Sequence, residues 1–349
     1  MRFLALSIGL LLPISAPAQL TPAVRTGLDS ALYLMQTHSL YAQRVNWPVV
    51  RDSVYQKAGR ARTLEEAFPA LRYAFDQLRD KHGMLAVESQ QYRYAEPGVD
   101  PGQRLSPGIR QEYLKGPRLV TAQLAPGVGY LKIPQMIGTA RAWADGRAAA
   151  LRDSLCRLLA RRPRALVIDL RMNGGGNSAP MLSGLGPLLG DGVKTYTIDR
   201  NGQVSGRMQL VGGMVVDERG APVLTPLPAC AVPPGLPVVV LVGPGTGSSG
   251  EILALALRDR PRTPLIGEPT SGYLSSTAGF FFGQQSGYLL LTTDNMAPAS
   301  KRPVLSQALT PDVYVKSADN YPNLRADPTV QAALRWLSRP THPNKKIRR

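Results

Sequence analysis

The hydrophobic pattern changes character partway along the chain. Between about residues 23 and 80, apolar residues recur at steps of three and four, which predicts helices that bury one face. Further on, short apolar runs alternate with amphipathic segments. Strands are predicted at residues 128–133, 165–170, 236–242 and 288–293, and helices at residues 140–160 and 251–258. Strands that alternate with helices indicate an α/β core.

Local signals mark the ends of the last N-terminal helix. Thr63, followed three residues later by Glu66, is the signature of a capping box. The helix that this box predicts is expected to end near residues 80–83, where Gly83 is a natural stop.

The segment after this helix lacks a clear period. Residues 91–118 carry Pro, Gly, Arg and Tyr without regular spacing, which predicts a linker or an excursion over the surface. We therefore expect a small N-terminal helical domain at residues 19–100 and an α/β domain at residues 101–349, which includes a basic C-terminal tail.

The first segment has the order of features of an export signal. One early positive charge, Arg2, precedes an apolar stretch that ends near Leu12, and Ala16 and Ala18 form an A-x-A site. The apolar stretch is shorter than the roughly 20 residues that a membrane-spanning helix needs. We expect a signal peptide at residues 1–18 and a soluble periplasmic or secreted protein with no integral membrane segment.

Composition narrows the possible partners. The formal net charge of +17 would suggest that a cytoplasmic protein binds nucleic acid. Export argues against that partner and leaves anionic envelope surfaces or acidic substrates as a weaker alternative.

Cys156 and Cys230 are the only cysteines. Export permits a disulfide between them, but we expect two buried free thiols. No CxxC-type cluster indicates a metal site, and no feature calls for an organic cofactor.

A serine follows the strand predicted at residues 236–242, at the mouth of a predicted helix. Ser248 lies in the segment Gly243-Pro-Gly-Thr-Gly-Ser-Ser-Gly-Glu251. A serine at a helix N-terminus meets the positive end of the helix dipole and free backbone N–H groups, which stabilise an oxyanion. The same serine and Glu251 also fit a capping box without any catalytic role.

A glycine-rich turn follows the strand predicted at residues 165–170. It reads Asp169-Leu-Arg-Met-Asn-Gly-Gly-Gly176, and its glycines let the backbone approach a ligand with N–H groups pointing inward. Such a turn can cradle a phosphate as well as an oxyanion. It lacks the Gly-Lys-Ser/Thr end of a P-loop and the glycine spacing of a dinucleotide-binding fingerprint.

The combination of these segments resembles the C-terminal-processing, or tail-specific, serine peptidases and their tricorn-core relatives. That family shows Asp-Leu-Arg-x-Asn-x-Gly-Gly, matched at residues 169–176, and Thr-x-Ser-x-x-Glu, matched at residues 246–251. It continues with Gly-Glu-x-Thr-x-Gly, matched at residues 267–272, and a late Pro-Asp, matched at residues 311–312. The resemblance covers roughly residues 60 to 320 and implies a crotonase-like ββα core.

The resemblance implies a role for each motif. It places the nucleophile on Ser248 and the oxyanion donors on the backbone of Ser249 and of Gly175 or its neighbour. One branch uses a Ser-Lys dyad with Lys directly after the Gly-Glu-x-Thr-x-Gly motif, but this chain has Tyr273 there. The tricorn-like branch takes a His from a Leu-x-Asp-x-His segment, matched here by His82. The resemblance therefore implies that His82 is the base that activates the serine.

The residue that orients the histidine departs from the family pattern. The tricorn-like branch has a Glu shortly before the late Pro-Asp, where this chain has no acid. Gln307 is the expected orienting residue, with Asp80 and Asp294 as acidic alternatives. Many family members also carry a PDZ domain before the core, but the about forty residues between Gly83 and Val128 are too few for one.

The expected function is peptide-bond hydrolysis by an exported serine endopeptidase that acts on peptides or proteins. The alternative is a non-catalytic module that binds peptides or another ligand on the same scaffold, because the Lys and the acidic orienting residue are both absent. An esterase or acyl-transfer enzyme with the same residues is a third possibility, which a comparison of ester with amide turnover would separate.

Overall fold

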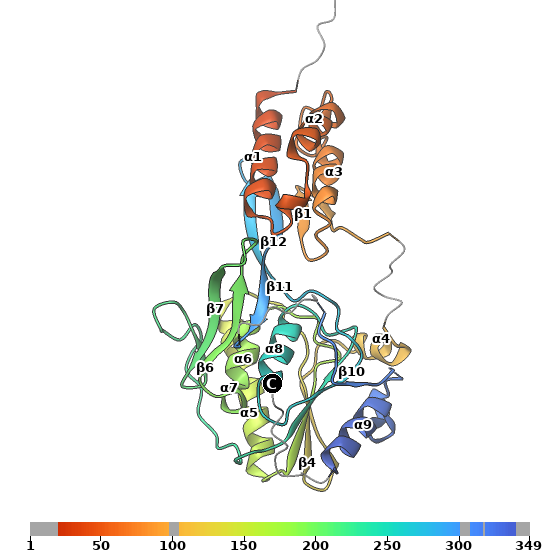
Figure 1. The fold of residues 1–349 in the computed structure, drawn as a ribbon, viewed down its shortest axis with the longest axis vertical. Helices are drawn as coiled ribbons and strands as arrows, with labels where there is room; N and C mark the ends of the chain where they lie inside the picture. The colour runs from red at the N-terminus through yellow and green to blue at the C-terminus, as the bar shows by residue number, and fades with distance from the viewer. Residues whose placement is uncertain (1–19, 98–104, 301–307, 317, 340–349) are drawn as a thin grey trace, which may run out of the picture. The chain divides into compact units, whose positions relative to one another are not determined.

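The computed structural model describes residues 20–97, 105–300, 308–316 and 318–339. The chain divides into two compact units (Figure 1). The helical unit comprises Met1–Tyr94 and Ala278–Leu291, and the α/β unit comprises Ala95–Thr277 and Thr292–Arg349. The expected signal peptide and the expected orienting residue Gln307 lie outside the described residues.

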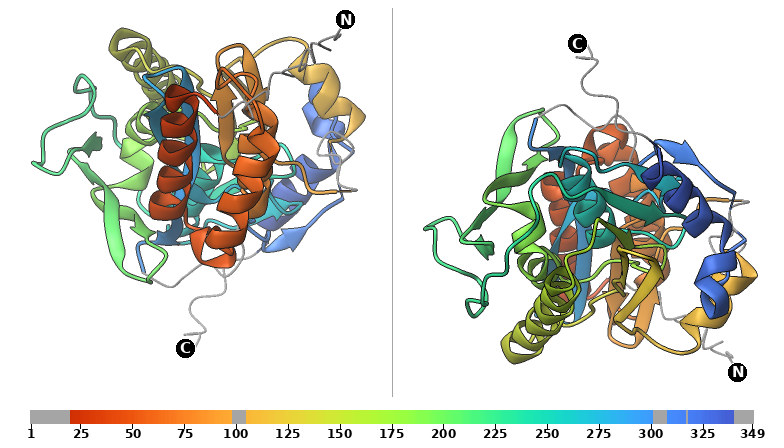
Figure 2. Two further views of the ribbon diagram at one scale, coloured as in Figure 1. Left: turned by 90° about the horizontal axis from the view of Figure 1, so that it is seen from above. Right: turned by 90° about the horizontal axis from the view of Figure 1, so that it is seen from below.

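The helical unit begins with helices that pack against one another (Figure 2). They are α1 (Pro22–His38), the 3-10 helix η1 (Ala42–Arg44), α2 (Trp47–Ala58) and α3 (Phe68–Leu78). Leu28, Val54 and Phe75, one from each α-helix, are fully buried in a shared apolar cluster. The helical pattern predicted for residues 23–80 is confirmed.

Both ends of α3 differ from the prediction. The Thr63 hydroxyl accepts the N–H of Glu66 at 3.1 Å, but this bond closes a turn that precedes the helix, which begins at Phe68. At the other end, Arg79 adopts the left-handed conformation with a φ of 52° and ends the helix. The prediction that Gly83 stops it was wrong, because the chain has already left the helix four residues earlier.

The helices of this unit pack on strands from two distant parts of the sequence. β1 (Met84–Val87) pairs antiparallel with β2 (Gln90–Tyr92) and with the first part of β12 (Gly287–Pro298). β11 (Ser275–Phe282) precedes β12 and pairs with it. The strand predicted at residues 288–293 is therefore confirmed, and its Leu289 and Leu291 are buried in the helical cluster.

A six-stranded sheet forms the centre of the α/β unit, in the order β13–β10–β9–β5–β4–β3. Its strands are β3 (Val120–Ala125), β4 (Val128–Lys132), β5 (Ala165–Asp169), β9 (Val238–Val242), β10 (Leu265–Gly267) and β13 (Val313–Tyr314). Neighbouring strands are parallel except β3, which is antiparallel to β4. The carboxyl ends of β5 and β9 therefore lie side by side, with Asp169 opposite Leu241.

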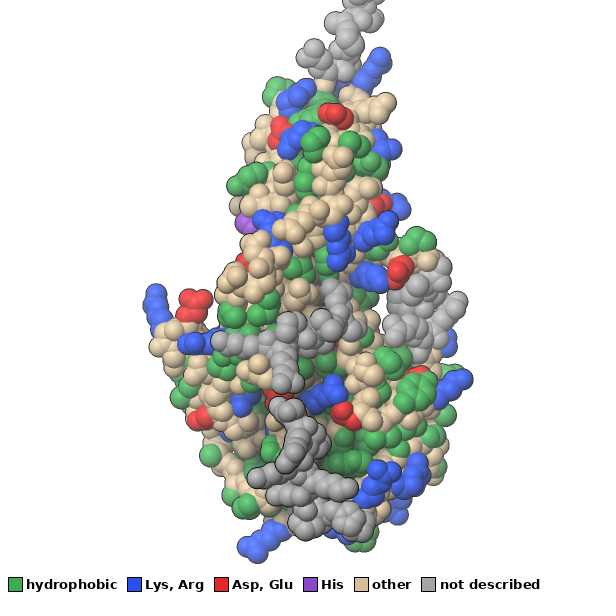
Figure 3. Space-filling model, viewed as in Figure 1, with side chains coloured by type: hydrophobic (Ala, Val, Ile, Leu, Met, Phe, Trp, Pro, Cys, Tyr) green, Lys and Arg blue, Asp and Glu red, His purple; other side chains and the backbone are tan. Residues whose placement is uncertain are grey.

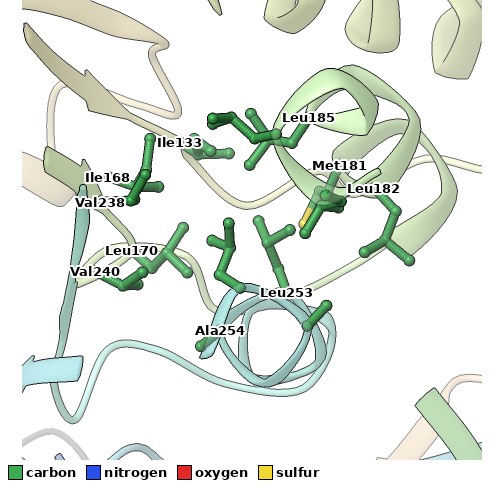
Figure 4. Close-up of a cluster of buried hydrophobic side chains, with 14 of the residues drawn as sticks. Ile133, Ile168, Leu170, Met181, Leu182, Leu185, Val238, Val240, Leu253 and Ala254 are labelled. Carbon is green, nitrogen blue, oxygen red and sulfur yellow. The ribbon is translucent and has the colours of Figure 1, made fainter. Parts of the chain in front are cut away.

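Helices cover both faces of this sheet. On one face lie α5 (Arg141–Ala160), α6 (Ser178–Gly184), α7 (Gly186–Leu189) and α8 (Ser249–Arg258). Figure 4 shows Ile168 and Val240 of the sheet directed toward Met181 of α6 and Leu253 of α8. On the other face lies α9 (Pro328–Leu337), whose Val330 joins a separate apolar cluster. The predicted α/β core is confirmed.

The remaining elements of the α/β unit lie outside the central sheet. β6 (Gly192–Ile198), β7 (Val204–Val211) and β8 (Met214–Val216) form antiparallel pairs, and β6 also pairs with the second part of β12. η3 (Tyr321–Ala326) precedes α9. α4 (Pro107–Tyr113) lies in the segment predicted to be irregular, where Ser106 caps the helix by accepting the N–H of Ile109. The linker prediction was wrong for these residues.

Cys156 and Cys230 form a disulfide, with their Cα atoms 5.7 Å apart. The prediction of two free thiols was therefore wrong. Cys156 is on α5, and Cys230 is on a Pro-rich loop that packs against this helix. The distance between their Cα atoms is within the range usual for disulfides. On the face drawn in Figure 3, Lys and Arg side chains are spread over the surface, with Asp and Glu among them.

Candidate active site

Ser248 lies where β9 gives way to α8. It is the N-cap of the helix and has a φ of +50°. A residue with a side chain rarely adopts this conformation, which costs roughly 1 to 3 kcal/mol and is found where surrounding contacts enforce it, often at functional sites. Next to Ser248, the N–H of Gly247 donates to the carbonyl of Asn173 at 3.0 Å and ties the loop Gly243–Gly247 to the glycine-rich turn.

Glu251 ties the serine to a second loop. Its carboxylate is fully buried and accepts the backbone N–H of Ser248 at 2.8 Å. It also accepts the N–H of Gly272 at 3.0 Å, the N–H of Tyr273 at 2.8 Å and the hydroxyl of Thr270. Burial raises the pKa of Glu251 to about 7, and these hydrogen bonds partly offset the rise.

The glycine-rich turn after β5 lies directly against the serine. Gly175 has a φ of +109°, and a Cβ added there would lie 2.7 Å from Cβ of Ser248 and 3.0 Å from N of Ser249. No side chain fits in that space. The Ser249 hydroxyl donates to the carbonyl of Gly176 at 2.5 Å and joins the start of α8 to the turn.

The two expected oxyanion donors differ in their hydrogen bonding. The backbone N–H of Ser249 has no acceptor among the residues that the structure describes. The N–H of Gly175 instead donates to the side-chain oxygen of Asn173 at 3.1 Å. Gly175 and Ser249 both lie beside Ser248.

A buried ionic cluster fixes the start of the glycine-rich turn. Arg171 is fully buried, with distances of 2.7 Å to Asp169, 2.6 Å to Asp319 and 2.8 Å to Asp327. Its guanidinium also lies 4.9 Å from the centre of the Tyr321 ring. Burial alone would raise the pKa of Asp169, but the adjacent Arg171 outweighs it and the pKa lies below its ordinary value.

His82 lies in the helical unit, four residues after the end of α3. The Asp80 carboxylate accepts the backbone N–H of His82 at 3.1 Å and that of Gly83 at 2.9 Å, which shapes the turn. Burial lowers the pKa of His82 below the ordinary 6.5, and the opposing effect of Asp80 is smaller. The imidazole is therefore mainly neutral at pH 7, the form that accepts a proton.

The proposed orienting residues can be placed only in part. Gln307 lies outside the described residues. Asp294 is on β12, where its carboxylate accepts the hydroxyl of Ser205. Asp80 is next to His82 and uses its carboxylate on backbone N–H groups.

Sequence reasoning missed the wider role of Glu251. It treated the residue as half of a capping box, because the spacing to Ser248 is local. Thr270, Gly272 and Tyr273 reach the same carboxylate from about twenty residues away. The sequence signal for this link was that Glu251 ends one matched family motif, at residues 246–251, while Thr270 and Gly272 belong to another, at residues 267–272. Within the described part of the chain, no group of three or more His, Cys, Asp or Glu residues is placed to hold a metal ion.

The sequence pattern of one peptidase family matches this region. The model of peptidase family S41 matches residues 127–315, more than half of the chain. The chain belongs to peptidase family S41. It is therefore a serine peptidase, and the resemblance to the C-terminal-processing peptidases is confirmed.

The chain is similar in sequence to proteins that carry different names. A nisin-resistance protein from Lactococcus lactis subsp. lactis is 24% identical over 297 residues, a match that covers 85% of each chain. The chloroplastic carboxyl-terminal-processing peptidase 2 of Arabidopsis thaliana is 27% identical over 214 residues, which is 60% of this chain and 37% of that protein.

Solved structures share the fold of this S41 peptidase. A lipoprotein from Streptococcus agalactiae superposes with a TM-score of 0.64 at 18% identity, and the match covers 95% of this chain and 99% of that one. A photosystem II D1 C-terminal processing protease superposes with a TM-score of 0.58 at 16% identity, covering 85% and 94%. Among the residues that the structure describes, no helix is long and apolar enough to span a membrane.

Proposed function

We propose that this S41 peptidase hydrolyses internal peptide bonds with Ser248 as nucleophile. The observation that carries the proposal is the placement of Ser248: strained, at the first turn of α8, and against a glycine-rich turn that admits no side chain. A nucleophile held at a helix N-terminus beside backbone N–H donors is in the environment that stabilises a tetrahedral oxyanion.

In the proposed reaction, the Ser248 oxygen attacks the carbonyl carbon of the peptide bond while its proton passes to His82. The negative charge that develops on the carbonyl oxygen is held by the N–H groups of Ser249 and Gly175. His82 then gives the proton to the leaving amine, and a water molecule repeats the sequence to release the acyl group. The lowered pKa of His82 supports this role, since a base must be unprotonated at the start.

The proposal also covers the residue that orients His82, the fold of the two units and the location of the protein. Gln307 orients the His82 imidazole, the α/β unit is a crotonase-like core preceded by a helical domain, and residues 1–18 direct export to the periplasm or beyond the cell. Kinship with a nisin-resistance protein and fold likeness to a lipoprotein support a location outside the cytoplasm. Membership of a peptidase family favours hydrolysis over the alternative of a binding module without catalysis.

The test is active-site labelling of the purified protein with a fluorophosphonate, followed by peptide mapping. We expect an adduct on Ser248 that is absent in Ser248→Ala and strongly reduced in His82→Ala. His38→Ala is the matched control, because His38 belongs to the same helical unit and stacks on Phe280 at 4.4 Å. Peptide hydrolysis that survives Ser248→Ala would show that another residue is the nucleophile.

A further inference from the structure

A small hollow lies beside the glycine-rich turn, within the α/β unit. Tyr113, Arg118, Lys132, Gln135 and Met172 line it, and its volume is about 40 Å³. One water needs at least roughly 10 to 15 Å³ of such space, so the hollow accommodates about three water-sized groups. That is the size of a carboxylate, and it is too small for an aromatic or a large aliphatic side chain.

The charge around the hollow is positive. Glu112 is the carboxylate among three cations: Lys132 at 2.6 Å, Lys115 at 2.7 Å and Arg118 at 3.8 Å. Lys132 is almost fully buried and committed to Glu112, whereas Arg118 stands beyond hydrogen-bond distance and is 55% exposed. The Arg118 guanidinium therefore has donors to offer to a second carboxylate.

The nearby acids do not line the hollow. The carboxylates of Asp169, Asp319 and Asp327 are directed to Arg171. The Tyr321 ring contacts both groups of charges, with its centre 5.2 Å from the Lys132 amine and 4.9 Å from the Arg171 guanidinium.

Two neutral polar groups join the hollow to the serine loop. A Cβ added to Gly174 would lie 3.2 Å from the Gln135 amide oxygen and 3.9 Å from the Tyr113 hydroxyl. A Cβ added to Gly245 would lie 3.5 Å from the same hydroxyl. Neither the Tyr113 hydroxyl nor the Gln135 amide makes a hydrogen bond to the described part of the chain. Burial raises the pKa of Tyr113, so its hydroxyl remains a proton donor.

We propose that this hollow is a subsite that binds a carboxylate of the substrate, with Arg118 as the principal contact and Tyr113 and Gln135 as additional hydrogen-bond partners. The proposal rests on the assignment of Ser248 as nucleophile, because that assignment makes the neighbouring hollow part of the substrate path. Two sources supply the same chemistry: an acidic side chain near the cleaved bond, or the carboxylate at the end of the chain.

The experiment uses matched fluorogenic peptides. Glu or Gln is placed in turn at each position within three residues of the cleaved bond, and each peptide is made as the free acid and as the C-terminal amide. We expect at least one Glu/Gln or acid/amide pair to differ in kcat/KM by about tenfold or more, the size of one hydrogen bond to a charged group. A difference found only in the Glu/Gln pairs identifies an acidic side chain as the source of the carboxylate, and one found only in the acid/amide pairs identifies the C-terminus of the substrate.

Arg118→Gln should abolish this preference, by lowering kcat/KM for the Glu or free-acid peptides to the level of their Gln or amide counterparts. Arg110→Gln is the matched control, since Arg110 is exposed on α4 and bonds the carbonyl of Leu105. Equal thermal unfolding of the two variants excludes a folding defect. The absence of any carboxylate preference, or its survival in Arg118→Gln, overturns the proposal.

A further measurement tests the carboxylate subsite independently of the assignment of Ser248 as nucleophile. Binding of labelled acid and amide peptides to Ser248→Ala is followed by fluorescence anisotropy. If Ser248→Ala still cleaves peptides, the nucleophile assignment fails, and the carboxylate preference is then measured on the surviving activity. Tighter binding of the carboxylate peptide that disappears with Arg118→Gln supports the subsite in either case.

Discussion

The carboxylate of Glu251 accepts the backbone N–H of Ser248 at 2.8 Å and, through its other hydrogen bonds, holds the loop that carries Tyr273. The chain conformation of the nucleophile candidate therefore depends on a side chain that cannot touch the substrate, because Glu251 is fully buried. Family members with a Ser-Lys dyad have their Lys at the position of Tyr273. In this chain the backbone N–H of Tyr273 donates to Glu251.

Replacing Glu251 tests this link. Glu251→Gln keeps the shape but places an amide N–H₂ against backbone donors, so we expect kcat to fall by about tenfold or more with KM little changed. Glu218→Gln, which removes an exposed charge, should leave both constants unaffected. A Glu251→Gln enzyme with unchanged kcat would show that the carboxylate has no influence on Ser248.

The same residue makes stability depend on pH. Burial raises the pKa of Glu251 from 4.5 to about 7, so the folded state binds the proton more tightly than the unfolded state. Its contribution to stability is complete below about pH 4.5 and is lost as pH rises through about 7, by up to about 3 kcal/mol. Urea unfolding from pH 4.5 to 8 should show this decline in the wild type, and a smaller one in Glu251→Gln.

The pH dependence of activity should report the titration of His82 rather than that of Glu251. Burial lowers its pKa below 6.5, and Asp80 opposes this effect, so kcat/KM should fall on the acid side with a midpoint below 6.5. Asp80→Asn keeps an oxygen acceptor for the backbone and removes the charge, which should move the midpoint lower still. Measuring the pH dependence of kcat/KM in the Glu251→Gln background removes the titration of the Glu251 carboxyl from the curve. A midpoint that rises in Asp80→Asn contradicts the assignment of His82 as base.

The disulfide should contribute measurably to stability. It joins cysteines 74 residues apart, and a crosslink over such a loop restricts the unfolded chain by an amount worth typically 2 to 4 kcal/mol. We expect a double Cys156→Ser, Cys230→Ser variant to unfold at lower urea concentration by this free energy. A reducing agent should destabilise the wild type equally and leave the double variant unchanged.

Arg171 should be far more sensitive to substitution than exposed arginines. Arg171→Met leaves Asp169, Asp319 and Asp327 buried without their cation, which costs about 3 to 5 kcal/mol. Arg51→Met removes a partly exposed pair with Asp29 and should cost no more than about 1 kcal/mol. Similar losses for the two variants would mean that the buried cluster contributes little.

The central strands could be predicted because both faces of the sheet are covered. Residues of β5 and β9 are buried along their whole length. In the sequence, β9 is therefore an uninterrupted apolar run, and β5 is apolar up to its last residue, Asp169. The turns at Ser248 and at Gly175 could be predicted for a related reason. Each turn follows one of these two strands, and because β5 and β9 are parallel neighbours, both turns lie at the same edge of the sheet.

The partners of these turns could not be predicted, because long-range packing selects them. Glu251 meets Thr270 and Arg171 meets Asp319 only after the chain has folded. The disulfide has the same origin, since no local pattern connects a helix with a Pro-rich loop. α4 was missed because seven residues are too few for a helical period to emerge.

The hairpin at residues 278–291 makes the helical unit discontinuous in sequence, and this determines when the unit can mature. Leu289 and Leu291 complete an apolar cluster whose helices are synthesised some two hundred residues earlier. An emerging chain therefore carries α1, α2 and α3 with one side of their cluster uncovered until the hairpin is made. Truncations that end before residue 278 should therefore leave this apolar surface exposed permanently.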